Sequence, residues 1–150
     1  MQTTSITTQI PADFQRVLDR LHSALAAMMN GDPEPYMAMW SHSDDVTLFG
    51  AWGPCKRGWA ELSKTFRWVA SRFGPDSECI IDDLVVQVCG DVAYTVGYER
   101  GDMVMDGERR PTTIRVSHIY QREAGEWKMF HRHGDFAPID QWLAESRRDS

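Results

Sequence analysis

Hydrophobic and polar positions alternate most clearly in the last third of the chain, between residues 112 and 135. Two segments there place an apolar or histidine side chain at every second position, and a short glycine-containing gap at 123–126 separates them. Alternation with period two predicts half-buried strands, and such a gap predicts a hairpin. The predicted inner face consists of Ile114, Val116, His118 and Tyr120 in the first strand and Trp127, Met129, His131, His133 and Asp135 in the second.

The length of the turn decides which residues of this hairpin face each other. We predict a two-residue loop at 124–125, which places Tyr120 opposite Met129. Farther from the turn, the same register places His118 opposite His131, so that the histidines share the core face with the apolar side chains. A three-residue loop would instead slip the register by one residue and move the second strand's set to the other face.

This predicted inner face changes from apolar near the turn to polar farther away. His118, His131, His133 and Asp135 would gather at the polar end. A buried polar group without a partner costs about 1–3 kcal/mol, so a cluster of them needs a physical reason. A ligand cavity is one such reason, and a solvated end of the sheet is the alternative.

Upstream of the hairpin, the pattern predicts helices first and strands afterwards. Amphipathic helices are expected at 11–30 and 59–73, where apolar residues recur every three or four positions. A short helix at 33–40 lies between them, and Asp32 can cap it. The segment 50–58 shows no periodicity and is predicted to be a loop. Further strands are predicted at residues 46–49, 77–89 and 92–105, with a turn at Asp106-Gly107.

This order of elements predicts an α+β fold, a cone in which three N-terminal helices pack in a strongly curved antiparallel sheet. Residues 11–150 would form one domain after a disordered leader at 1–10, with a short tail after Pro138 that is helical through Trp142.

Composition bounds the classes of function. The net charge of −6 and the pI near 5.3 argue against a nucleic-acid partner, because that affinity comes from neutralising phosphates with Lys and Arg. No apolar run reaches the length of a membrane span, and the N-terminus lacks the features of a signal peptide. Cys55, Cys79 and Cys89 have no metal-ligand spacing, and because their number is odd at least one thiol is unpaired. A free thiol fits a reducing compartment best, so we expect a cytoplasmic protein.

Several of these motifs also carry a family resemblance over residues 11–137. The Asn30-Gly31-Asp32 helix end, the Asp44-Asp45-Val46 start of a strand and the Gly125-x-Trp127-x-x-x-His131-x-His133 strand resemble the SnoaL-like, ketosteroid-isomerase-like branch of the nuclear transport factor two-like superfamily. The last motif is also similar to the association domain of calmodulin-dependent kinases. The resemblance implies a cone with a pocket and a homodimer formed through the outer face of the sheet. The superfamily includes enzymes, ligand-binding modules and assembly domains, so fold alone does not give function.

The steroid isomerases of this branch need a carboxylate base, a tyrosine and a protonated aspartate. The corresponding positions here are Ala24 for the tyrosine, Gly50 for the base, and Ser117 or His118 for the aspartate. Because none of these residues can do that chemistry, we predict that steroid isomerisation by this mechanism is absent.

His133 and Asp135 are the candidate catalytic residues. Their side chains alternate onto one face, and a carboxylate bonded to an imidazole raises its basicity for acid–base work near neutral pH. In the alternative interpretation, Asp135 pairs with Arg115 or Arg132 and has no chemical role. No metal or cofactor is predicted, since no further Cys or His spacing supports one.

The remaining candidates would line the pocket. His118 and His131 could polarise a carbonyl or hold a water, or could simply stabilise the sheet. Aromatic pocket candidates are Tyr98, Tyr120, Trp40, Trp52 and Trp59. We favour an ordinary core position for Trp40 and Trp59, and Trp52, which stands in a glycine-rich loop, is the candidate lid.

Two functions are compatible with the sequence. The first is a small-molecule pocket protein that acts as an acid–base enzyme of isomerase, cyclase or dehydratase type on a small apolar or cyclic substrate. The second is a non-catalytic ligand-binding or dimerisation module. A homodimer is expected in either case, because the opposite face of the hairpin is too apolar for a free surface. That face is predicted to carry Arg115, Ser117, Ile119, Gln121, Phe130 and Phe136.

Overall fold

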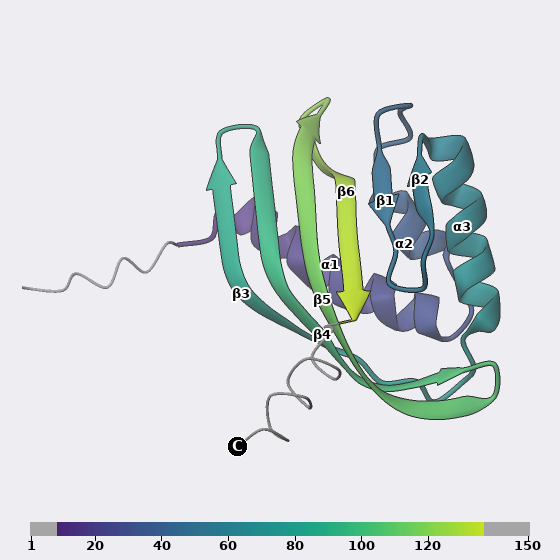
Figure 1. Ribbon diagram of the computed structural model, residues 1–150. Coiled ribbons are helices and arrows are strands. Elements are labelled where there is room, and N and C mark those ends of the chain that lie inside the picture. The colour runs from purple at the N-terminus through teal and green to yellow at the C-terminus, as the bar shows by residue number, and fades with distance from the viewer. Residues whose placement is uncertain (1–8, 137–150) are drawn as a thin grey trace, which may run out of the picture.

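Three helices lie against the concave face of a strongly curved six-stranded sheet (Figure 1). The computed structural model describes residues 9–136 of the chain. The predicted α+β cone is confirmed. The elements, in chain order, are α1 (Ala12–Met29), α2 (Glu34–Ala38), β1 (Thr47–Phe49), β2 (Cys55–Arg57), α3 (Trp59–Arg72), β3 (Ile80–Cys89), β4 (Val92–Met105), β5 (Glu108–Glu123) and β6 (Glu126–Phe136).

The strands are ordered β2-β1-β6-β5-β4-β3 across the sheet. Strands β3 to β6 form the expected antiparallel succession, but β1 pairs with β6 in parallel, so the sheet is mixed. Strand β2 pairs with β1 inside the segment that was predicted to be only a loop. All three residues of β2 are exposed, so no alternation of apolar and polar residues marked it.

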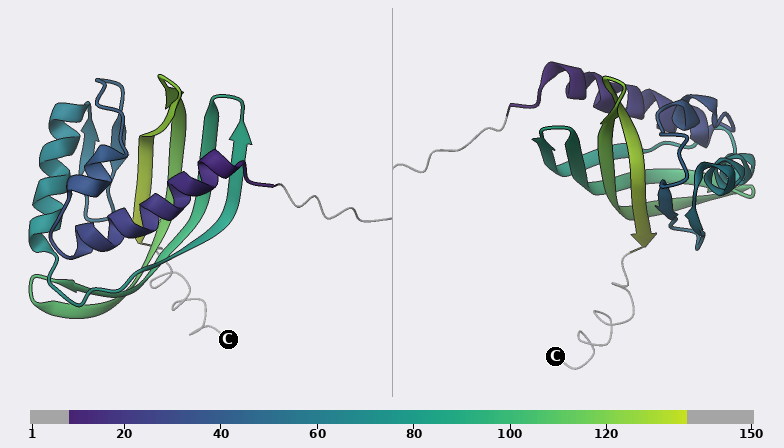
Figure 2. Two further views of the ribbon diagram at one scale, coloured as in Figure 1. Left: turned by 180° about the vertical axis from the view of Figure 1, so that it is seen from behind. Right: turned by 90° about the horizontal axis from the view of Figure 1, so that it is seen from above.

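Helix α1 crosses the strands on the concave side, and α3 stands beside β1 and β2 (Figure 2). The first turn of α1 is tied to the sheet because the Trp127 indole Nε1 donates to Asp13 Oδ2 over 3.1 Å. The predicted capping residue of α2 is also in place, since the Glu34 backbone N–H donates to Asp32 Oδ1 over 3.1 Å.

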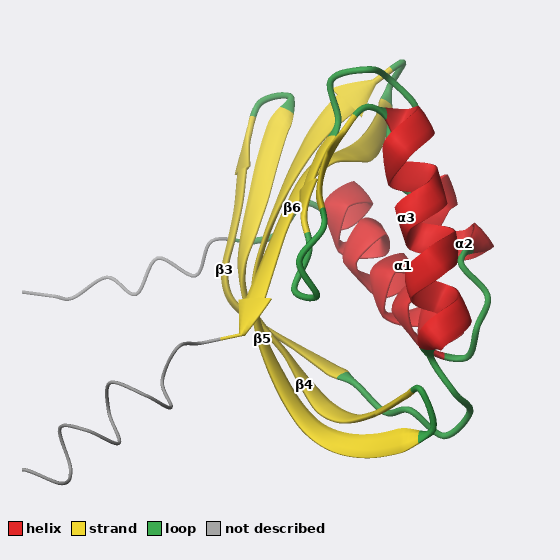
Figure 3. Cartoon of the chain, turned by 45° about the vertical axis from the view of Figure 1, so that its right-hand side comes forward, coloured by secondary structure: helices red, strands yellow, loops and turns green. Residues whose placement is uncertain are grey.

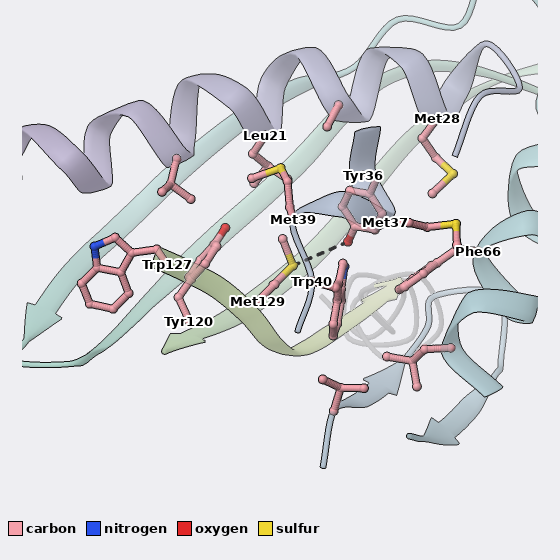
Figure 4. Packing of buried hydrophobic residues seen from close by; sticks show 14 of the residues in the cluster. Leu21, Met28, Tyr36, Met37, Met39, Trp40, Phe66, Tyr120, Trp127 and Met129 are labelled. Atoms are coloured by element: carbon pink, nitrogen blue, oxygen red, sulfur yellow. Dashed lines mark hydrogen bonds between the residues drawn. The ribbon is translucent and has the colours of Figure 1, made fainter. Parts of the chain in front are cut away.

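The core fills the space between the helices and the sheet (Figure 4). Figure 4 shows Tyr36 of α2 next to Met129 of β6, with Phe66 of α3 beyond Trp40 and with Tyr120 and Trp127 toward the other end of the cluster. Phe14 packs edge-on against both Tyr120 and Trp127, with ring centroids 5.1 and 5.3 Å apart. The alternation near the hairpin turn therefore identified the core face correctly.

The far ends of β4 and β5 bend round under the helices, which closes one end of the cone (Figure 3). Close backbone approach between β3 and β4 accompanies this bend. A Cβ atom at Gly97 would collide with the Asp82 carbonyl oxygen, and one at Gly101 would collide with the Glu78 carbonyl oxygen. Only glycine fits where two backbones come so close.

The β5–β6 hairpin begins in the predicted register. Ala124 and Gly125 have φ values of 51° and 81°, as a two-residue turn with two left-handed positions requires. Tyr120 lies opposite Met129, as the turn predicts.

Beyond that pair, a β-bulge shifts the register by one residue. Phe130 and His131 together occupy the place opposite Ile119. His118 consequently lies opposite Arg132, and the prediction that it faces His131 is wrong. The bulge reverses the direction of every later side chain of β6, whereas the apolar or histidine residues in the sequence continue at every second position, so the sequence pattern did not reveal it.

No helix within residues 9–136 is long and apolar enough to cross a membrane. The predicted helical tail after Pro138 and most of the predicted leader lie outside the residues that the structure describes.

Candidate ligand-binding site

A narrow cavity of about 60 Å³ lies between the helices and the bent part of the sheet. Its walls come from α1, α2, α3, the β1–β2 segment and strands β4, β5 and β6. Most of the lining is apolar, and the polar side chains lie at one end. The lining residues include Leu25, Met28, Met29, Tyr36, Leu48, Trp52, Thr65, Phe66, Val69, Phe73, Glu99, Met103, Ile114 and Arg132.

A buried ion pair forms the polar end. Arg132 donates from Nη1 to Glu99 Oε2 over 2.6 Å and from Nη2 to Glu99 Oε1 over 2.9 Å. Glu99 is 2% exposed and Arg132 is 9% exposed. Two parallel bonds of this kind fix the guanidinium plane as well as its charge.

Each charge of this pair stabilises the ionised form of the other group. Burial alone would raise the pKa of Glu99, but the charge and hydrogen bonds of Arg132 outweigh it and leave that pKa lowered. Burial would likewise lower the pKa of Arg132, and the Glu99 charge outweighs it, so that pKa is raised. Both groups are therefore ionised at neutral pH.

His118 completes the buried cluster. Its Nε2 lies 3.1 Å from Arg132 Nη1, and because arginine has no acceptor, this nitrogen must accept the hydrogen bond. The imidazole proton then sits on Nδ1, which faces Thr95 Oγ1 at 3.5 Å. Burial and the nearby Arg132 charge lower the pKa of His118 to about 3, so the ring is neutral. His118 orients the guanidinium and is a weak base.

Space for the guanidinium depends on Gly134. A Cβ atom at this position would lie 3.1 Å from Arg132 Nη2 and 3.2 Å from Ile114 Cγ2. Both distances are tighter than ordinary packing allows. Gly134 therefore leaves room for the planar group against the sheet.

The other two predicted histidines and Asp135 lie on the outer face of the sheet, as a consequence of the bulge. The expectation that His131 and His133 share the inner face with His118 is therefore wrong. His131 Nδ1 lies 2.7 Å from Thr47 Oγ1, and burial is the main cause that lowers the pKa of His131.

His133 and Asp135 do contact each other, with 3.4 Å between His133 Nε2 and Asp135 Oδ2. Arg115 Nε also donates to Asp135 Oδ1 over 2.6 Å, and this bond is the main cause of the lowered pKa of Asp135. The pairing with Arg115 that the sequence left open is thus present together with the dyad. These groups line a shallow outer groove of about 240 Å³ that also includes Tyr98 and Ser117.

The aromatic candidates separate into three environments. Trp52 lines the cavity, and its ring packs edge-on against Phe73 and Phe136. Trp40 and Tyr120 are fully buried in the core. Neither the indole Nε1 of Trp40 nor the hydroxyl oxygen of Tyr120 has a hydrogen-bond partner within residues 9–136.

Trp59 and Tyr98 lie away from the cavity. Trp59 stacks on His42, with 4.0 Å between the ring centroids and an angle of 10° between the planes. Tyr98 lies on the outer face, in the groove with His133. Phe136, which was predicted to lie on the outer face, packs against Trp52 on the inner side.

The sequence reasoning missed Glu99 and Arg132, which carry the charge of the cavity. A signal for Glu99 was available, since alternation along β4 places it on the face opposite Tyr98 together with the small residues Ala93, Thr95 and Gly97. A charged side chain on a face of small residues indicates a buried, partnered group. Arg132 had no comparable signal, because its inward direction depends on the register beyond residue 130.

Within residues 9–136, no group of three or more His, Cys, Asp or Glu side chains is arranged to hold a metal ion.

Comparison with known proteins places the chain within a broad set of related folds. A family model for the SnoaL-like domain matches residues 17–139. No curated protein matches the sequence. Among solved structures, the fold is similar to a ketosteroid isomerase-like protein from Erwinia carotovora atroseptica, with a TM-score of 0.68, 20% identity, and coverage of 85% of this chain and 98% of that chain.

Two further structures show how varied these relatives are. A candidate dehydratase of the nuclear transport factor two-like family from Streptomyces avermitilis has a TM-score of 0.67, 17% identity, and coverage of 83% of this chain and 97% of that chain. The association domain of a calmodulin-dependent kinase from C. elegans has a TM-score of 0.65, 18% identity, and coverage of 83% and 95%. At such identities the likeness establishes the fold alone.

Proposed function

Because the chain belongs to the family of SnoaL-like domains, we propose that it binds a small, largely apolar molecule in the cavity beside the Glu99–Arg132 pair. The observation that supports this proposal is the place of the pair, which is buried and forms part of the wall of a mostly apolar cavity.

The energetics of ion pairs support this interpretation. Removing two charges from water costs several kcal/mol per ion, and well-packed apolar residues of similar volume are often equally stable. Stability alone is therefore a weak reason for Glu99 and Arg132 at this position. Convergent polar groups in an apolar cavity are typical of a ligand site, where they orient the bound molecule.

The cavity supports binding better than acid–base catalysis. A general base works best when its pKa lies near the working pH. The pKa of His118 is about 3 and its Nε2 is already engaged, while the pKa of Glu99 is lowered by Arg132. We therefore take the cavity groups to position a ligand.

A second candidate function is acid–base chemistry at the outer face. It is supported by the 3.4 Å contact between His133 and Asp135 and by the groove that they share with Tyr98 and Ser117. Because this groove is shallow and half-exposed, it would need a covering partner to exclude water.

A second copy of the chain is the partner that we propose for this face. Val92, Tyr94 and Val96 of β4 are 38–43% exposed there, and register places Ile119 beside Tyr94. Such a patch usually marks an interface. Val96→Glu should lower the sedimentation coefficient to that of a monomer, whereas Trp68→Glu on the exposed side of α3 should not. A wild-type chain that is monomeric at all concentrations would contradict the dimer.

Trp52 is the proposed lid of the cavity. Its ring also lines a neighbouring groove of about 550 Å³, so it lies where the cavity and this groove meet. Gly53 beside it has φ of 104°, a conformation that glycine adopts freely. Trp52→Ala should therefore speed ligand association and release, measured by stopped-flow fluorescence, with little change in melting temperature.

A thermal-shift screen with a matched pair of variants tests the binding proposal. A ligand that binds only the folded chain stabilises it by about 2.7 kcal/mol when the free ligand concentration is one hundred times the Kd. This stabilisation raises the melting temperature. Ala51→Phe should abolish the shift because residue 51 lines the cavity, and Ala60→Phe on the exposed start of α3 should retain it. Hits that survive Ala51→Phe unchanged would place the site elsewhere and overturn the proposal.

The cytoplasm remains the proposed location. It is supported by Cys55, Cys79 and Cys89, which are all free thiols.

A further inference from the structure

The guanidinium of Arg132 has more hydrogen-bond donors than it uses among the described residues. Arginine carries five N–H groups. Two of them bind Glu99 and one binds His118. The Nε–H group and the second Nη2–H group make no hydrogen bond of ordinary length within residues 9–136, although an N–H group of Arg132 approaches the Tyr36 oxygen at longer range. Arg132 lines the cavity, so an acceptor atom of a bound molecule is what can engage them.

Tyr36 brings another donor to the same end of the cavity. Its hydroxyl has one partner in the described range, the weak acceptor Met129 Sδ at 3.9 Å. Burial raises the pKa of Tyr36, while the charge and N–H groups of Arg132 and the Trp40 N–H lower it. The Trp40 contact is a long one, since Nε1 has no partner at hydrogen-bonding distance. These groups present hydrogens to the phenol oxygen, which leaves its own hydrogen available for another acceptor.

The polar end of the cavity has no net charge, so it does not attract an ionic ligand. Glu99 balances Arg132, and His118 is neutral. An anion would bind next to the Glu99 carboxylate and a cation next to the Arg132 guanidinium, and like charges repel strongly in a low-dielectric interior. A neutral molecule avoids both penalties.

The size of the cavity limits the part of the ligand that it encloses. A volume of about 60 Å³ corresponds to roughly five water-sized spheres, at about 10–15 Å³ each. A five-membered ring with one substituent atom is of this size. A larger molecule would extend past Trp52 into the neighbouring groove.

We infer that the cavity selects neutral molecules that present a carbonyl-type oxygen, and that Arg132 and Tyr36 hold this oxygen while the apolar walls enclose the adjoining ring. This inference rests on the proposed binding function and names the class of ligand for the same cavity. The two residues are binding groups, and no reaction is implied.

Four cyclopentane derivatives test the inference, three with six non-hydrogen atoms and one, the carboxylate, with eight. They are cyclopentanone, its hydrocarbon isostere methylenecyclopentane, cyclopentanol and cyclopentanecarboxylate, each titrated into the protein by NMR. We expect cyclopentanone to bind on the order of tenfold tighter than methylenecyclopentane, because it gains hydrogen bonds to otherwise unpaired buried donors. The alcohol and the carboxylate should both bind more weakly than the ketone.

A tyrosine variant and its matched control assign the effect to the cavity. Tyr36→Phe should weaken cyclopentanone binding on the order of fivefold and leave methylenecyclopentane unchanged. The ¹³C resonance of the bound carbonyl should also move less far downfield than in the wild-type protein. Tyr94→Phe, which removes the same hydroxyl from the exposed outer face, should change neither result.

The outcomes separate this inference from the proposed function. If the hydrocarbon binds as tightly as the ketone, small-molecule binding stands and selection of an oxygen acceptor is overturned. Tighter binding of the alcohol or the carboxylate overturns the inference as well, since Glu99 or a net positive charge would then dominate. If none of the four probes binds, the inference falls, while the proposed function is decided by the thermal-shift screen with Ala51→Phe and Ala60→Phe.

Discussion

The inner and outer faces of the β5–β6 hairpin hold similar side chains in opposite environments. On the inner face, Arg132 lies 2.6 Å from a Glu99 oxygen, and both side chains are at most 10% exposed. On the outer face, Arg115 lies 2.6 Å from an Asp135 oxygen, but the two side chains are 49% and 39% exposed. The bond lengths are equal, so distance does not separate the two pairs.

Access of water is what separates them. An exposed ion pair is worth about 0–1 kcal/mol, because solvent screens it. A buried pair interacts far more strongly, and losing one partner leaves a charge without compensation. The comparison also covers the histidines, since burial lowers the pKa of the enclosed His118 to about 3, while the outer His131 is only partly buried and contacts the Thr47 hydroxyl. Environment, more than residue type, determines what each cluster can do.

The largest expected effect comes from breaking the inner pair alone. Arg132→Met should lower the free energy of unfolding by about 3–5 kcal/mol, because Glu99 remains buried and unpaired. Arg115→Met on the outer face should cost less than about 1 kcal/mol. Urea denaturation of both variants measures the difference, and similar losses would show that the two faces are energetically alike. Adding Glu99→Gln to Arg132→Met should recover part of the loss.

The next effect is a dependence of stability on pH. The folded pKa of His118, about 3, lies below its ordinary value of 6.5. As pH falls below 6.5, the unfolded chain therefore binds a proton that the folded chain does not. Stability from this group is complete above pH 6.5 and decreases toward pH 3, by about 1.4 kcal/mol per pH unit.

A variant without the imidazole isolates that contribution. His118→Gln should be measurably less sensitive than the wild-type chain when unfolding is followed by urea between pH 6.5 and pH 4.5. The two proteins should differ by roughly 2 kcal/mol in the unfolding free energy that they lose over those two pH units. Parallel curves for the two proteins would mean that His118 is protonated in the folded state.

A smaller effect should follow from removing the bulge. Deleting Phe130 leaves Tyr120 opposite Met129 and Ile119 opposite His131, so Arg132 should still point inward. We expect a loss of about 1–3 kcal/mol from packing, similar to that of Phe130→Ala, which keeps the bulge. NMR contacts between the His118 ring and the Arg132 guanidinium would report the register. Loss of those contacts would show that the shortened strand pairs with β5 in a different register.

The smallest effect on stability is expected for Asp135→Asn. The side chain is half-exposed, so the change should cost less than about 1 kcal/mol. If the outer dyad is a base, the same change should abolish most of any turnover while sparing ligand affinity, because an amide cannot stabilise an imidazolium. Asp102→Asn, an exposed carboxylate in β4, is the matched control. Full activity in Asp135→Asn would make the dyad structural.

Local sequence signals predicted the elements that depend on local physics. The apolar periods of α1 and α3 and the turns at 106–107 and 124–125 were read correctly because each reflects the conformation of a few adjacent residues. Strand β2 left no such signal, because its three residues are exposed and gain their structure only by pairing with β1. The parallel contact between β1 and β6 was equally invisible, since it joins segments far apart in the chain.

The sequence by itself determined that this chain forms an α+β cone of the SnoaL-like family, with a hairpin whose core face is apolar near its turn. It did not determine which polar residues that cone encloses. A single extra residue at Phe130 sent His131, His133 and Asp135 outward and Arg132 inward, where it meets Glu99 from a different hairpin. The physical reason is that strand alternation fixes side-chain direction only relative to the neighbouring residue, whereas burial depends on register and on what packs above the strand. Both are properties of the tertiary structure.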